Sequence, residues 1–167
     1  MVRSAPWIET EYNNQFSPAT FYVLRAEEFQ LVLVKRAFLT DGTSIPTGSI
    51  IPNYVEFKYL IYINNLGNAQ SDITMRDVLD SAFQYQLESI QLDNSVGKCA
   101  AAACDATEEL AIFTAVNGAA VLTDAVDGDI VSYAAAIIDA GNGNVGNLQL
   151  DINANAVWAI LFSVKMP

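Results

Sequence analysis

Three aspartates within six positions are the residues whose chemistry stands out first. Asp124, Asp127 and Asp129 surround Gly128 in the run TDAVDGDI. Hard cations such as calcium favour carboxylate and carbonyl oxygens in flexible loops, so the run predicts a calcium site. Its spacing departs from the EF-hand pattern, which ends in a glutamate. The alternative is a solvated Asp-Gly turn ahead of a strand.

The two cysteines form the second candidate for chemistry. Cys99 and Cys104 are separated by four residues, all of them alanine. A thiol-metal site normally needs further ligands close by. In an exported chain the pair therefore predicts a local disulfide, and two buried free thiols are the alternative.

Enzymatic chemistry is poorly supported by the rest of the chain. Histidine is absent, which removes the commonest general base and the usual ligand for zinc. Glu108 or Glu109, with an aspartate elsewhere, could supply the two acids of a glycosidase. A helix would place these two glutamates on diverging faces, and this favours solvation. We expect no catalytic residues and no cofactor other than the calcium considered above.

A covalent cross-link is a further hypothesis. Lys35, Asn155 and an acid such as Asp77 could form the buried Lys–Asn isopeptide that some surface β-sandwiches contain. The reaction requires an acid whose pKa burial has raised, placed beside both partners. A mass lower by one ammonia would identify the bond.

Composition limits the class of protein and its partners. The 167 residues suit one domain with an extension. Charged residues make up 16% of the chain, against roughly 25% in an average soluble domain. We therefore expect apolar surface to meet another subunit. The net charge of −11 repels phosphate backbones, so nucleic acid is not an expected partner.

The segments that must position these residues mostly show the alternation of apolar and polar residues that is typical of β-strands. Alternation predicts strands near residues 55–64 and at 156–166, the latter with one inward set of side chains: Trp158, Ile160, Phe162 and Val164. Further strands are predicted at 29–34, 73–78, 85–92 and 130–138. Asp105 followed by Glu108 favours a short helix at 105–117, although the run IFTAV within it would also suit a strand. The pattern predicts an all-β fold, an immunoglobulin-like or jelly-roll β-sandwich with one short helix.

Residues 30–80 resemble a family known as the conserved-repeat "domain of unknown function eleven". The shared features are a first strand with Lys35, the run YLIYINNLGN at 59–68 and a segment that closes on Asp77 and Leu79. The resemblance implies an immunoglobulin-like domain of bacterial or archaeal envelope proteins. It also implies a cell-surface location and a structural or adhesive role, without catalytic residues.

The amino-terminal part suggests how such a domain would assemble. We interpret residues 1–28 as an extension and candidate donor strand, and residues 29–167 as the sandwich domain. An apolar strand on an arm can pair with the sheet edge of a neighbour and build a head-to-tail polymer. The predicted assembly residues are Phe16, Phe21, Tyr22, Val23 and Leu24, and the alternative is an edge strand within one molecule.

These observations predict a structural subunit of an extracellular filament or surface layer. Its contacts with copies of itself would involve the N-terminal segment and the apolar outer faces of the end strands. No apolar run reaches the length of a secretory signal or a membrane helix, so membrane insertion is not expected. Alternatives are a monomeric adhesive or carbohydrate-binding module that presents Trp7, Tyr12 or Tyr54, and a viral capsid or tail subunit.

Overall fold

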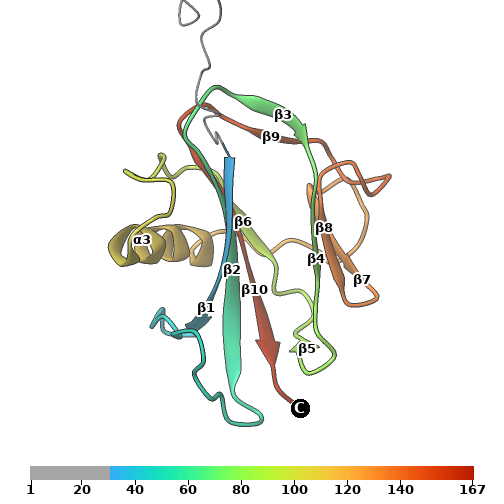
Figure 1. Ribbon diagram of the computed structural model, residues 1–167. Coiled ribbons are helices and arrows are strands. Elements are labelled where there is room, and N and C mark those ends of the chain that lie inside the picture. The colour runs from blue at the N-terminus through green and yellow to red at the C-terminus, as the bar shows by residue number, and fades with distance from the viewer. Residues whose placement is uncertain (1–30) are drawn as a thin grey trace, which may run out of the picture.

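The computed structural model describes residues 31–167, and these residues form an all-β, sandwich-like fold with one helix. This confirms the predicted fold class. The described elements, in chain order, are β1 (Leu31–Leu39), β2 (Glu56–Asn65), β3 (Gln70–Ile73), β4 (Met75–Val78), β5 (Gln84–Tyr85), β6 (Gln91–Asp93), α3 (Ala106–Asn117), β7 (Val131–Ala134), β8 (Ile137–Ala140), β9 (Leu150–Ile152) and β10 (Val157–Lys165). Figure 1 shows their arrangement.

The main sheet is built on the long antiparallel pair β2 and β10. Its strand order is β1-β2-β10-β5, and β6 pairs with β10 beside β5. Ile61 on β2 lies opposite Lys35 on β1 and Ile160 on β10, so β2 is flanked on both sides and β1 forms the edge. A second layer contains the sheet β4-β8-β7, and the pair β3-β9 lies beside it at one end (Figure 1).

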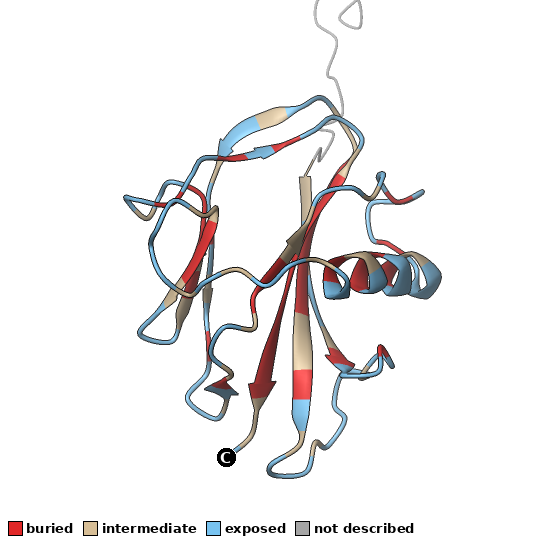
Figure 2. Cartoon of the chain, turned by 180° about the vertical axis from the view of Figure 1, so that it is seen from behind, coloured by how far each residue is buried: buried red, intermediate tan, exposed pale blue. Residues whose placement is uncertain are grey.

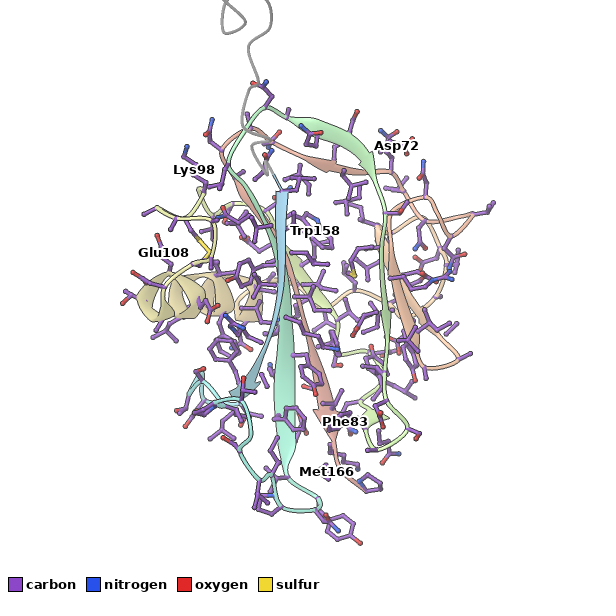
Figure 3. The ribbon with its side chains drawn as sticks, in the orientation of Figure 1. Asp72, Phe83, Lys98, Glu108, Trp158 and Met166 are labelled. Carbon is purple, nitrogen blue, oxygen red and sulfur yellow. A yellow bond between two sulfur atoms is a disulfide. The ribbon has the colours of Figure 1, made fainter. Side chains whose placement is uncertain are left out.

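The two faces of β10 lie in two separate apolar clusters. Trp158, Ile160, Phe162 and Val164 pack toward the second layer with residues such as Ile138, as the alternation predicted. Trp158 is seen between the two layers in Figure 3. Val157, Ala159 and Leu161 face the other way and pack under α3. The prediction that outer faces of the end strands meet another subunit is therefore wrong for β10, because the helix covers that face.

Helix α3 confirms the helix that the Asp105 and Glu108 spacing predicted. The Asp105 side chain accepts hydrogen bonds from the backbone N–H groups of Thr107 and Glu108, and Glu108 bonds back to the Asp105 N–H. This reciprocal capping satisfies donors that a helix start leaves free. The ring of Phe113 packs on Phe38 of β1 at 4.8 Å between centroids. Figure 2 shows buried residues along the side of α3 that meets the sheet.

Two predicted strands are interrupted by turns. The run at 130–138 is not one strand but most of the hairpin β7–β8, in which Ala135 and Ala136 adopt positive φ angles of 50° and 63°. The sequence shows no glycine or asparagine there to reveal a turn of this kind. The run at 85–92 likewise divides into β5 and β6, with Glu88 at a φ of 53° between them. Within residues 31–167, no helix is long and apolar enough to cross a membrane.

Candidate functional site

The outer edge of β1 is the most distinctive surface feature that the fold creates. After β1 the chain turns at Gly42, and residues 43–45 run back along the outside of the strand. The Leu39 N–H donates to the carbonyl of Thr43 and the Ile45 N–H donates to the carbonyl of Ala37, each at 2.8 Å. These bonds occupy the edge at residues 37–39, which we name the covered segment.

Residues 31–36 of β1, which we name the open segment, have no such cover from residues 31–167. In a strand, peptide groups point to alternate sides, so the outward-facing Ala37 and Leu39 place those of Leu31, Leu33 and Lys35 outward as well. No hydrogen bond from the described part of the chain reaches these outward groups. An exposed row of unpaired N–H and C=O groups is a template for another strand.

The side chains of the open segment also favour pairing. The segment begins LVLV, and the Leu33 side chain is 60% exposed. Val34 packs partly buried against the cluster under α3, while Leu31 packs against the cluster between the layers. Long apolar edge strands are uncommon on soluble monomers because they invite association. The open segment therefore combines backbone groups that residues 31–167 leave unpaired with exposed apolar surface.

Lys35 fixes the open segment to the second layer. Its Nζ lies 2.6 Å and 2.9 Å from the two carboxylate oxygens of Asp77 on β4. The same ammonium lies 4.3 Å from the ring centroid of Tyr59, within the range of a cation–π contact. The pair thus joins the edge of one sheet to a strand of the other.

The predicted isopeptide trio does not assemble. Lys35 and Asp77 meet, but Asn155 is exposed and bonds through its backbone to Gly67, beyond the far end of β2. Lys35 lies opposite Ile61, whereas the neighbourhood of Asn155 is reached only at Asn65, about 13 Å further along that strand. A bond between the Lys35 and Asn155 side chains is therefore ruled out by this geometry.

Arg36, the next residue, fixes the open segment to the helix. Its Nε donates to Oε1 of Glu109 at 2.9 Å, and the Tyr62 hydroxyl donates to the same oxygen at 2.8 Å. Burial, together with the hydrogen bond to Glu109, raises the pKa of Tyr62 above its ordinary value, so the hydroxyl remains a donor. Glu109 is buried, so the expectation that it is solvated is wrong. Its position on the same helical face as Ile112 and Val116 could have predicted this burial from the sequence.

The structure joins Cys99 and Cys104 in a disulfide, and both residues are buried beside α3. The side chain of Asn64 secures the loop, because its Nδ2 donates to the carbonyls of Ala101 and Ala102 and its Oδ1 accepts from the Cys99 N–H. Glu108 approaches the two sulfurs, and these three residues form the one cluster of potential metal ligands within residues 31–167.

The ligand atoms of this cluster are already engaged. The sulfurs of Cys99 and Cys104 are bonded to each other, and the two oxygens of Glu108 accept from the N–H groups of Ala100 and Asp105. Figure 3 shows the disulfide close to the labelled Glu108 at the start of α3. The disulfide and the hydrogen bonds to Glu108 therefore hold the cysteine loop against the start of α3.

The three aspartates of the predicted calcium site are not brought together. Their carboxylate oxygens do not form a group within 4.8 Å of one another. Asp124 accepts from the Tyr85 hydroxyl and the Glu88 N–H, whereas Asp127 accepts from the Thr123 hydroxyl at 2.6 Å. Asp129 uses its backbone carbonyl to accept from the Leu148 N–H. These contacts stabilise the turns around the three aspartates.

The predicted assembly residues Phe16, Phe21, Tyr22, Val23 and Leu24 lie outside the described residues, as do Trp7 and Tyr12. Tyr54, the third aromatic considered for ligand binding, is 79% exposed in the connection between β1 and β2. Its N–H donates to the carbonyl of Met166 near the end of the chain.

Comparisons of the chain with family models, with curated proteins and with solved structures found no match. The resemblance of residues 30–80 to a surface-protein family therefore stays a prediction. The open edge of β1 and the surfaces around it are the features of the described residues that bear on function.

Proposed function

We propose that this chain is a structural subunit that assembles with copies of itself into an extracellular filament or surface layer. The observation that carries the proposal is the open segment of β1. It presents outward peptide groups at Leu31, Leu33 and Lys35 beside a largely exposed leucine side chain. A strand from another copy would satisfy those groups and cover that side chain.

Residues 20–24 are the proposed donor strand. The run TFYVL is short, apolar and rich in residues that suit strands. Donor and acceptor would lie at different places on the subunit, so the contact would be head-to-tail. A contact of this kind need not close into a ring and can extend into a filament.

The chain composition and the disulfide agree with an extracellular assembly. A disulfide persists in oxidising surroundings outside the cytoplasm. The low fraction of charged residues, 16%, fits a subunit part of whose surface is covered by its neighbours. We place the polymer outside the cell on these grounds, together with the resemblance of residues 30–80.

Removal of the donor tests the proposal. The full chain and a chain lacking residues 1–28 are compared by electron microscopy and sedimentation velocity at increasing concentration. We expect polymers from the full chain only, while circular dichroism shows that the shortened chain keeps its fold. A full chain that remains monomeric at high concentration would contradict the proposal, because residues 20–24 would then cover the edge of their own molecule.

A further inference from the structure

We infer that an apolar pocket in the connection between β1 and β2 receives an aromatic side chain from residues 1–30 of a second copy. This inference rests on the proposed function and names the surface that anchors the donated segment. The pocket has a volume of about 230 Å³. Its apolar lining comes chiefly from Leu39, Ile45, Pro46, Ile50, Ile51 and Val55.

The pocket suits a side chain rather than a free ligand. Its volume is below the roughly 300–1,000 Å³ of typical small-molecule sites. The lining includes no charged residue, and Ser44 and Ser49 supply its only hydroxyl groups. Ile50 is 94% exposed at this site and Leu39 is 36% exposed, so apolar surface remains for an occupant to cover. Aromatic side chains in such pockets are typical anchors of protein interfaces.

The pocket lies at the opposite end of the domain from the start of β1. Leu39, which lines the pocket, ends a strand that begins at Leu31, about 27 Å away. Figure 1 shows β1 beginning at the upper end, while the connection to β2 and the chain terminus lie at the lower end. Residues 1–30 therefore join the described domain at the end away from the pocket.

End-to-end stacking of copies would make a second copy the source of the occupant. If copies stack end to end along β1, the N-terminal segment of one copy starts beside the pocket of the next. The segment contains Trp7, Tyr12, Phe16, Phe21, Tyr22 and Phe29. Thirty residues can extend over roughly 100 Å, which is ample for the pocket and the edge beyond it.

The pocket lies beside the covered segment, and the open segment comes next along β1. Ile45 lines the pocket and also bonds to Ala37, the first residue of the covered segment. A donated segment that passes the pocket would next reach Lys35 and Leu33. In end-to-end stacking its donor strand would run parallel to β1, whereas residues 20–24 folded back on their own β1 would run antiparallel. The pocket would anchor the segment, and the edge would bind its backbone.

Two substitutions of exposed residues test the pocket in the full chain. Ile50→Asp places a charge at the pocket, and Val145→Asp places one at a residue that is 92% exposed elsewhere. We expect Ile50→Asp to raise the critical concentration for assembly at least about tenfold, because a desolvated charge opposes an apolar anchor. Val145→Asp should change it less than about twofold, and light scattering measures both.

A photo-reactive analogue at position 22 identifies the molecule that supplies the N-terminal segment. Polymers formed from a mixture of light and heavy isotope-labelled chains should yield cross-links from position 22 to residues 33–55 that join light to heavy chains. Cross-links confined to single chains would overturn the inference. Normal assembly of Ile50→Asp would overturn the pocket while leaving the proposed function intact, whereas a wild-type chain that never assembles would overturn both.

Discussion

The two segments of the outer edge of β1 differ although they belong to one strand of one sheet. At residues 37–39 the chain itself returns, and residues 43–45 bond to the outward groups of Ala37 and Leu39. At residues 31–36 the described chain supplies no such partner, and Leu33 is largely exposed. The contrast indicates that the returning loop protects one part of this edge. Where that loop does not reach, the outward N–H and C=O groups can accept another strand.

The open segment is nevertheless held firmly on its other sides. Adjacent residues connect it to both neighbouring layers, Lys35 to Asp77 on β4 and Arg36 to Glu109 on α3. Its inner edge pairs with β2 along the whole strand. The open segment is therefore held in an extended conformation by the rest of the domain. The following substitutions distinguish the contribution of its inner edge from that of its outer edge.

Val34→Pro should have the largest effect, because it damages the inner edge. The Val34 N–H points to β2, opposite Tyr62, and its side chain packs under α3. Proline removes that N–H, and we expect the free energy of unfolding to fall by about 2–4 kcal/mol. Chemical denaturation measures the change. An unchanged midpoint would show that β1 does not depend on its pairing with β2 at this position.

Glu109→Ala should cost about 1–3 kcal/mol, because it leaves the buried Tyr62 hydroxyl without its acceptor and releases Arg36. Glu108→Gln serves as the control, because it keeps an acceptor at the helix cap. Thermal denaturation of both variants separates the effect of the buried hydrogen bonds to Glu109 from the effect of capping. A loss in Glu109→Ala no greater than in Glu108→Gln would contradict this role.

Leu39→Pro removes an outward N–H that is bonded within the chain. The lost donor leaves the carbonyl of Thr43 without its partner, and we expect about 1 kcal/mol of destabilisation. Hydrogen exchange should also become faster at Ile45, because the returning segment loses one of its bonds to the edge. Retained protection at Ile45 would show that this bond does not hold the covering segment in place.

Lys35→Met should have the smallest effect on stability, below about 1 kcal/mol. The ion pair with Asp77 is partly exposed, and such pairs contribute little in water. The contact with the Tyr59 ring adds a modest amount. Arg76→Met, which removes the more exposed pair with Asp139, serves as the matched control. A loss of several kcal/mol for Lys35→Met would mean that the layers depend on this one bridge.

Local patterns predicted the elements that local chemistry determines. The capping residues Asp105 and Glu108 identified α3, and alternation identified β10 with its inward tryptophan. The turn at Ala135 and Ala136 escaped detection, because alanine rarely adopts a positive φ and gives no turn signal. Glu109 was misjudged because its acceptor role depends on Tyr62, 47 positions earlier in the chain.

The candidate site could be predicted only in part. The apolar run at the start of β1 was visible, but its place at a sheet edge follows from the pairing of β2 with β10, residues about a hundred positions apart. The return of residues 43–45 along the strand was equally hidden in a loop rich in glycine and proline. The sequence did suggest that Lys35 lies beside Asp77. It also suggested that Asn155 lies beside Lys35, but the two are separated along the length of β2.

The most direct test compares Leu33→Pro with Leu33→Ala in the full chain. Leu33→Pro removes an outward N–H and no bond to β2, a position where a sheet edge tolerates proline. Leu33→Ala shortens the same side chain and keeps the N–H. Electron microscopy should show polymers for Leu33→Ala and none for Leu33→Pro, with both variants folded by circular dichroism. Polymers of normal length from Leu33→Pro would contradict strand addition at this edge.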